Sequence, residues 1–168
     1  GIRYLKTDDG KRALDALKLN MPLLGPLFRK LYMARFSRTG ATLLATGVPM
    51  IDALEICARS VNNSYVGEAI LRAADKVKNG KGLAESLENE DYILKLAPQM
   101  IGIGEKSGRV DEMMAKTATV YENELDATIR AISTVIDPVL MVVLAVVAGG
   151  MIAAILLPIY QLVGNIKV

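Results

Sequence analysis

One uncharged stretch near the end of the sequence constrains the fold more than any other feature. It runs from Pro138 to Ile166 and is rich in Val, Leu, Ile, Ala and Gly. A helix rises about 1.5 Å per residue, so roughly 20 apolar residues cross a bilayer core, and Val139–Ile159 supplies 21 without a charge. Buried helices of soluble domains are seldom so long and so apolar on every face. We therefore predict a transmembrane helix over residues 137–161 and a short tail over 162–168.

The remainder of the sequence has the charge content of a polar-surfaced domain. Residues 1–137 hold 19 of the 20 Lys and Arg residues and all 18 Asp and Glu residues, so they are nearly neutral and give little electrostatic support for nucleic-acid binding. The charges are unevenly placed. Residues 1–38 contain nine basic and three acidic residues, whereas 82–137 contain five basic and eleven acidic ones. The basic segment suits an anionic membrane surface or an acidic partner, and an ordinary solvated face is the alternative.

The residue types that most often carry catalysis or metal binding are scarce. The sequence has no histidine, which removes the commonest metal ligand and the commonest general base. Cys57 is the only cysteine, so no internal disulfide can form and a reducing compartment is indicated. Neither a phosphate-binding loop nor a nucleophile elbow is present. We predict a protein without enzymatic activity, cofactor or metal site.

Apolar residues recur at intervals of three and four through most of the sequence, which is typical of α-helices. Alternation of the kind that marks β-strands never persists, so the predicted fold class is all-α. Gly47 ends one helix and Pro49 begins the next, and Pro98 must either start or kink its helix. The predicted helices are a short one from about Thr7 to Asn20, then 27–44, 50–61, one from an N-cap at Ser64 to the stop at Asn79–Gly80, 83–87, 92–104 and 110–132.

Short connections between these helices favour antiparallel neighbours. We therefore predict that residues 27–136 form an antiparallel six-helix bundle, followed by the transmembrane helix. Residues 1–26 are interpreted as a basic connecting arm with one short helix. Because the sequence begins at Gly1 without a signal peptide, we expect it to be part of a longer protein.

The densest group of glycine and polar residues in the predicted bundle lies between its last two helices. It comprises Gly104, Glu105, Ser107, Gly108 and Arg109. Two glycines four residues apart permit a tight, left-handed corner between helices. One interpretation is a structural helix-turn-helix cap, and the other is an exposed contact for a partner or a second subunit.

Asp137 and Pro138 stand at the start of the apolar run. Aspartate at an N-cap followed by proline at the first helical position is ordinary helix-start chemistry. The alternative is a functional acid within the membrane. Pro158, near the far end of the run, is expected to kink the helix.

Small residues recur within the apolar run. Ala145, Gly149 and Ala153 are spaced every four residues, and Gly150 lies beside them. Stripes of this kind let two helix backbones approach closely. We predict packing against another transmembrane helix, and chance in a segment rich in Gly and Ala is the alternative.

An ordered series of short blocks resembles the domain shared by type II secretion F proteins and type IV pilus platform proteins. Each block alone is weakly specific, but together they span about residues 27–163 in the order that the family shows. Two positions depart from the family pattern: Pro98 stands where an apolar helix usually continues, and Asp137 replaces an expected glutamate. The blocks are Arg35–Gly40, Leu43–Met50 with Ala53–Leu54, Gln99–Glu105, Ser107–Arg109, Asp111–Met113, the acid before Pro138, and Leu157–Tyr160.

The resemblance implies a second copy of a six-helix cytoplasmic domain with the last of three membrane helices. It also implies a non-enzymatic platform in the bacterial inner membrane, with the helical domain in the cytoplasm and the C-terminal tail in the periplasm. The implied partners are an assembly or retraction ATPase, pilin or pseudopilin, other inner-membrane assembly proteins, membrane lipid and a second copy forming a homodimer. A membrane-tethered helical signalling or adaptor protein is the alternative function.

Overall fold

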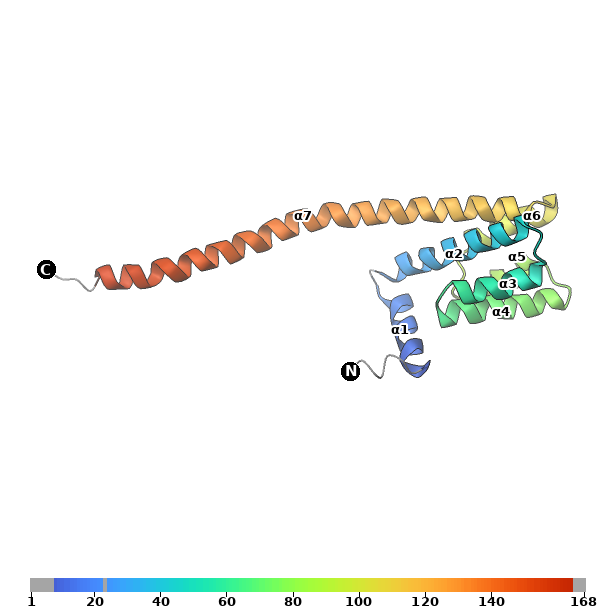
Figure 1. Ribbon diagram of the computed structural model, residues 1–168, viewed down its shortest axis with the longest axis horizontal. Coiled ribbons are helices and arrows are strands. Elements are labelled where there is room, and N and C mark those ends of the chain that lie inside the picture. The colour runs from blue at the N-terminus through green and yellow to red at the C-terminus, as the bar shows by residue number, and fades with distance from the viewer. Residues whose placement is uncertain (1–7, 23, 165–168) are drawn as a thin grey trace. The chain divides into compact units, whose positions relative to one another are not determined.

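A computed structural model of the chain describes residues 8–22 and 24–164, with side chains at 10–22 and 24–160. Every regular element in this part is an α-helix, which confirms the predicted all-α class. The chain forms two units, residues 1–126 and 127–168, whose boundary falls within the last helix. In chain order the helices are α1 (Asp8–Asn20), α2 (Gly25–Ala45), α3 (Met50–Ser60), α4 (Ser64–Lys78), α5 (Leu83–Glu88), α6 (Leu96–Ser107) and α7 (Val110–Gly164) (Figure 1).

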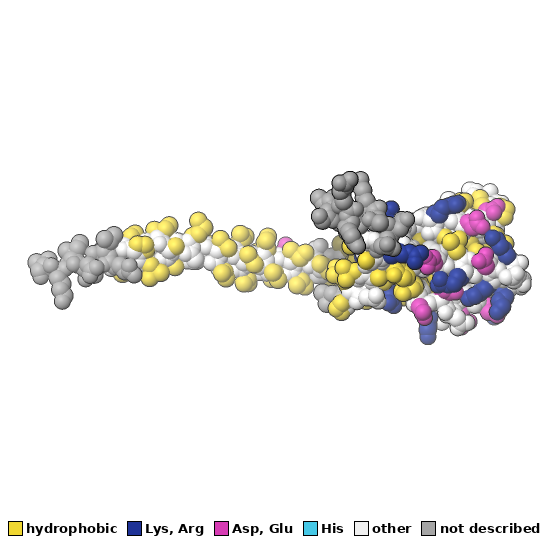
Figure 2. Space-filling view, turned by 90° about the horizontal axis from the view of Figure 1, so that it is seen from below, with side chains coloured by type: hydrophobic (Ala, Val, Ile, Leu, Met, Phe, Trp, Pro, Cys, Tyr) yellow, Lys and Arg dark blue, Asp and Glu magenta, His cyan; other side chains and the backbone are white. Residues whose placement is uncertain are grey.

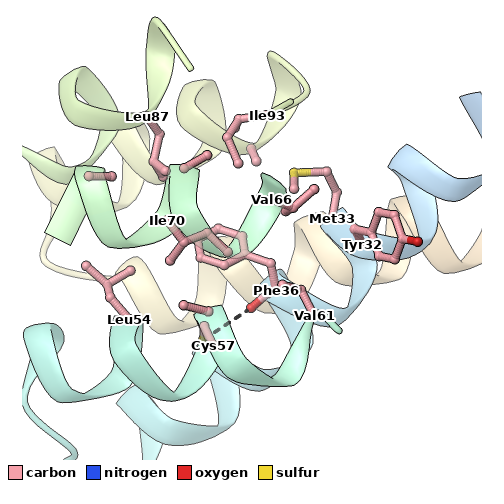
Figure 3. Close-up of a cluster of buried hydrophobic side chains, with 14 of the residues drawn as sticks. Tyr32, Met33, Phe36, Leu54, Cys57, Val61, Val66, Ile70, Leu87 and Ile93 are labelled. Atoms are coloured by element: carbon pink, nitrogen blue, oxygen red, sulfur yellow. Dashed lines mark hydrogen bonds between the residues drawn. The ribbon is translucent and has the colours of Figure 1, made fainter. Parts of the chain in front are cut away.

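The first unit is organised around an apolar core to which each of its helices contributes. Phe36 and Met33 of α2 are completely buried at its centre. The apolar residues that recur along α3 and α4 face this core, as their spacing predicts. Burial of each large apolar side chain stabilises the fold by about 1.5–3 kcal/mol. The surrounding side chains from α3, α4, α5 and the segment after α5 include Leu54, Cys57, Val61, Val66, Ile70, Leu87 and Ile93 (Figure 3).

Glycines end α2 and α4 in the left-handed conformation. Gly47 has φ 86° and Gly80 has φ 92°, values that glycine adopts without steric cost. After α2, the N–H of Val48 donates to the carbonyl of Leu43 at 3.0 Å, which is the bond that closes a Schellman motif. Pro49 immediately precedes α3. The predicted break between these helices is therefore confirmed, although Pro49 is the N-cap residue and not the first helical residue that was predicted.

α4 begins with a different cap from the one predicted. Asn63 is the N-cap, and its Oδ1 accepts from the N–H groups of Tyr65 and Val66 at 3.1 and 3.2 Å. Ser64 is instead the first helical residue, and its N–H and hydroxyl both donate to Asp15 Oδ2 at 2.9 Å. The prediction of a Ser64 cap is wrong by one residue, because asparagine caps as well as serine does.

α6 is shorter at its start than predicted. It begins at Leu96, so the segment 92–95 lies outside it. Pro98 is in the first turn, where the missing N–H has no acceptor within the helix. Of the two interpretations of Pro98, the structure supports the one in which it starts the helix.

α7 passes through Pro138 without ending. Asp137 therefore caps no helix, and the predicted helix start at this point is wrong. Pro138 has no N–H to donate to the carbonyl of Thr134. The hydroxyls of Ser133 and Thr134 each bond to the carbonyl four residues earlier, at 3.0 and 2.9 Å, and such bonds often bend helices.

The second unit consists of an apolar helix whose side chains are uncovered. All side chains over 131–160 are exposed, including Val139, Leu144 and Ile155 at 56, 59 and 63%. Figure 2 shows apolar atoms along this part of α7. Among the described helices, α7 is the one long and apolar enough to cross a membrane. A surface of this kind suits lipid or other membrane helices rather than water. The tail predicted at 162–168 lies mostly outside the described residues.

Candidate functional site

The glycine-containing motif singled out in the sequence forms the connection between α6 and α7, and we call residues 104–109 the α6–α7 corner. Gly108 has φ 71°, in the left-handed region. The N–H of Arg109 donates to the carbonyl of Gly104 at 2.8 Å and closes the turn. Ser107 Oγ donates to the carbonyl of Ile103 at 3.0 Å. Gly108 thus supplies the backbone conformation that turns the chain from one helix into the next.

Gly104 serves the corner in a different way. It is buried, and a Cβ atom at this position would lie 2.7 Å from Val110 Cα and 3.0 Å from the Arg109 carbonyl oxygen. Real Cβ atoms do not approach backbone atoms so closely, and these neighbours belong to the start of α7. The absence of a side chain at Gly104 therefore allows α6 and α7 to meet.

Glu105 reaches across to the N-terminus of α5. Its carboxylate accepts from the N–H of Leu83 at 2.5 Å and from the N–H of Ala84 at 3.2 Å. The N-cap residue of α5 is Gly82, which has no side chain to perform this role. A carboxylate at a helix N-terminus satisfies free N–H groups and interacts favourably with the helix dipole. Glu105 is thus a cap supplied by a neighbouring helix.

Arg109 presents an exposed charged side chain at the corner. Its side chain is 67% exposed, and its guanidinium lies 3.6 Å from the carboxylate of Glu112 in the next turn. Exposed pairs of this kind contribute little to stability. Gly104, Glu105, Ser107 and Gly108 have structural roles here. Arg109 remains our predicted contact residue for a partner.

A buried carboxylate lies on another side of the first unit. The side chain of Glu90 is only 7% exposed, and it accepts from Arg72 Nη2 at 2.7 Å and from Lys76 Nζ at 2.9 Å. Burial opposes the ionised form, but the hydrogen bonds from both cations outweigh it and hold the pKa of Glu90 below its ordinary value. Sequence reasoning missed this cluster because its three members are ordinary surface residue types.

Two ion pairs connect α2 to the first part of α7. Arg38 makes a two-pronged contact with Glu122, at 3.0 and 2.8 Å, and lies 3.3 Å from Thr119 Oγ1. The hydrogen bond from Arg38 lowers the pKa of the Glu122 carboxyl. Lys30 Nζ lies 2.8 Å from Glu124 Oε2. Arg38 belongs to the first block of the family resemblance, and the structure gives it the role of orienting α7 within the first unit.

The remaining predicted site residues are in α7, within the second unit. Asp137 is exposed, and Pro138 and Pro158 both lie inside the helix. A Cβ atom added at Gly149 or Gly150 would meet nothing within 4 Å. The flat surface at these glycines therefore leaves space against which a further helix can pack, and that packing stays a prediction.

Two observations describe the metal-binding and thiol chemistry of the described residues. Among the residues that the structure describes, no three His, Cys, Asp or Glu side chains gather as a metal site would require. The thiol of Cys57 is buried, donates to the carbonyl of Phe36 at 3.7 Å, and has its pKa raised by burial to about 12 (Figure 3). A thiol of this kind is a poor nucleophile.

Comparison with known proteins gives one consistent result. The family model described as type II secretion system (T2SS), protein F, matches residues 36–158. The type IV pilus assembly proteins PilC of Myxococcus xanthus and Thermus thermophilus are 40 and 36% identical to the chain, over 94 and 98% of its length. The type II secretion system protein F of Pseudomonas aeruginosa is 37% identical over 96%. These matches cover 38, 41 and 40% of the respective relatives, so the chain spans about two fifths of their length.

Proposed function

The chain belongs to the type II secretion system protein F family, and from this premise we propose that it is part of the inner-membrane platform of a type IV pilus or type II secretion machine. The observation that supports the proposal is the extent of the family match, residues 36–158. It includes most of the helical first unit and most of the apolar part of α7. The relatives are named for pilus assembly or for secretion, and the proposal therefore covers both machines.

In this role the chain is non-enzymatic and transmits motion between other proteins. The bundle (27–136) lies in the cytoplasm, residues 137–161 cross the inner membrane, and the tail (162–168) enters the periplasm. The bundle contacts an assembly or retraction ATPase, and α7 packs beside other membrane helices. ATP-driven movement is thereby passed to pilin or pseudopilin as it is inserted or extracted. A second copy of the chain and other inner-membrane assembly proteins complete the platform.

Two features of the first unit suit this role. The α6–α7 corner presents the exposed guanidinium of Arg109 on a rigid backbone turn, which is a suitable contact for an acidic surface of the ATPase. The pairs of Arg38 with Glu122 and Lys30 with Glu124 join α7 to α2. A force applied to the bundle therefore acts on the start of the same helix that continues into the apolar run.

Deleting the bundle tests the proposal in the bacterium that encodes the chain. The gene is replaced by a version that lacks residues 27–126, which are most of the bundle, and pilin or pseudopilin is measured by immunoblot in whole cells and in the sheared surface fraction. We expect synthesis to continue while surface assembly or secretion is lost. Normal surface assembly in the deletion strain would show that the chain is not a platform component.

A point variant tests the ATPase contact separately. Arg109→Glu is compared with Lys116→Glu, which makes the same charge change at another exposed position of the first unit. We expect Arg109→Glu to reduce chemical cross-linking of the chain to the ATPase at unchanged protein level, and Lys116→Glu to leave it intact. If Arg109→Glu cross-links to the ATPase as strongly as Lys116→Glu does, Arg109 is not part of the contact.

A further inference from the structure

A cleft between α1 and the connection of α3 to α4 carries an excess of positive charge. We call it the α1 cleft. α1 packs beside the N-terminal end of α4 (Figure 1), and residues of both helices line the cleft. Four cations and two carboxylates line it, which gives a net charge of +2. The charged residues are Lys11, Arg12, Asp15, Lys18, Arg59 and Glu68.

Both carboxylates of the cleft are already engaged. Asp15 accepts from the N–H and the hydroxyl of Ser64, each at 2.9 Å, and so holds α1 to the start of α4. Glu68 pairs with Arg12 at 2.7 Å. These contacts neutralise one cation and leave no free acid in the cleft.

Three cations of the cleft are left over. Lys11, Lys18 and Arg59 form no ion pair or side-chain hydrogen bond within the part of the chain that the structure describes. Lys11 and Lys18 are seven residues apart in α1 and share one face of the helix, about 10 Å from each other along its axis. Arg59 approaches from the last turn of α3. The arrangement suits several negative charges spread over a surface.

An exposed apolar side chain also lines the cleft. Leu71 of α4 is 43% exposed there, and Leu17 of α1, outside the cleft lining, is 58% exposed. Cations near exposed leucines are the combination that binds at the interface between lipid headgroups and acyl chains.

We propose that the α1 cleft binds the headgroups of anionic phospholipids. The proposal rests on the membrane anchorage included in the proposed function, although not on the identity of the machine. Asp126 ends the first unit and Val139 begins the uncharged apolar stretch of 21 residues, thirteen positions later. Thirteen residues span at most about 45 Å even when fully extended. The tether therefore keeps the cleft at a high effective concentration relative to the bilayer.

An anionic membrane surface is favoured over an acidic protein segment because the chain carries its own apolar tether. The tether keeps the first unit near the bilayer, and each lysine or arginine near an anionic surface strengthens association by about fivefold. Three unpaired cations together give a gain on the order of 100-fold at low salt. The attraction falls as salt screens it, within a Debye length of about 8 Å at physiological ionic strength.

The test uses the full chain in nanodiscs, since its apolar helix is inserted whatever the lipid. Hydrogen exchange of the α1 amides is compared between discs of phosphatidylcholine alone and discs that also contain phosphatidylglycerol. We expect α1 to exchange at least tenfold more slowly in the anionic discs, and we expect high salt to remove the difference. Equal exchange in the two lipids would overturn the proposal.

Charge-reversal variants locate the effect. The triple variant of Lys11, Lys18 and Arg59 to Glu should lose the lipid dependence. A matched triple variant elsewhere in the first unit should keep it, because it changes the net charge equally. If the triple Glu variant fails to fold, a variant with Gln at the same three positions repeats the test. The matched variant replaces with Glu three exposed lysines that form no ion pair within the described residues, Lys95, Lys106 and Lys116.

The remaining outcomes point away from lipid. If the matched variant also loses the lipid dependence, net charge rather than the cleft is responsible. If inorganic phosphate slows α1 exchange equally in neutral discs, the site binds free phosphate. If exchange is independent of lipid but the cleft variant cannot assemble pili, the cleft binds an acidic protein. Each of these results overturns the proposal while leaving the platform role testable by the bundle deletion.

Discussion

Alanine at Gly104 should destabilise the first unit, although alanine is the better helix former. The new Cβ would lie 2.7 Å from Val110 Cα, 3.0 Å from the Arg109 carbonyl oxygen and 3.1 Å from Val110 N. All three are backbone atoms, so no side chain can rotate away and the two helices must separate. Such overpacking costs about 1–3 kcal/mol, whereas the gain in helix propensity is about 0.5–1 kcal/mol. We expect a net loss of about 1–2 kcal/mol.

Gly102→Ala is the matched control for this variant. Gly102 lies in the same helix, but its Cβ would meet only the Ala84 methyl group at 3.4 Å, which is an ordinary contact. Thermal unfolding of the full chain in detergent, followed by circular dichroism, should show a melting temperature lower by on the order of 5 °C for Gly104→Ala. The melting temperature of Gly102→Ala should equal or exceed that of the unmodified chain. If Gly104→Ala is as stable as Gly102→Ala, the close approach at the corner is not what requires glycine.

Three further predictions concern single side chains. Because the pKa of Glu90 is lowered in the fold, its stabilising contribution is complete above the ordinary value of 4.5 and is lost as the pH falls further. The free energy of unfolding measured in urea should therefore be lower by about 1–3 kcal/mol for Glu90→Gln at neutral pH. Below pH 4.5 this free energy should fall less for Glu90→Gln than for the unmodified chain. Glu105→Ala should speed hydrogen exchange at Leu83 in α5 and lower the free energy of unfolding by about 1 kcal/mol. Glu105→Gln keeps a hydrogen-bond acceptor and should lower it less. Unchanged exchange in the alanine variant would contradict the capping role. Cys57, buried with a pKa of about 12, should react with a thiol reagent only after unfolding, so rapid labelling of the folded chain at neutral pH would contradict the core packing.

Local signals in the sequence located most helix ends correctly. The helix ends at Gly47 and Gly80 depend only on residues within one turn, and both lie where they were predicted. The N-cap of α4 was misplaced because Asn63 and Ser64 are both good caps and sequence alone does not rank them. The start of α6 was misplaced because apolar spacing continues into a segment that is not helical.

Features that join distant residues could not be predicted in this way. The contact of Glu105 with Leu83 crosses 22 positions, and nothing near either residue indicates it. The burial of Glu90 depends on two cations from α4. Asp137 before Pro138 resembles a helix start, yet α7 continues through both. Helix-start signals describe the conformation that a short segment favours by itself. When the residues before and after the segment are both helical, the helix can continue through such a signal.

Pro138 makes α7 easier to bend at the edge of its apolar part. Elsewhere in a helix, opening one side of a turn stretches the hydrogen bond between residues four apart. Pro138 has no N–H, so that bond to the carbonyl of Thr134 does not exist and bending there has nothing to stretch. The Thr134 hydroxyl also bonds to a carbonyl of its own helix, which favours curvature at the same turn. If the apolar segment spans a bilayer, as proposed, it can therefore change its tilt there at low elastic cost, without unwinding the helix that carries it.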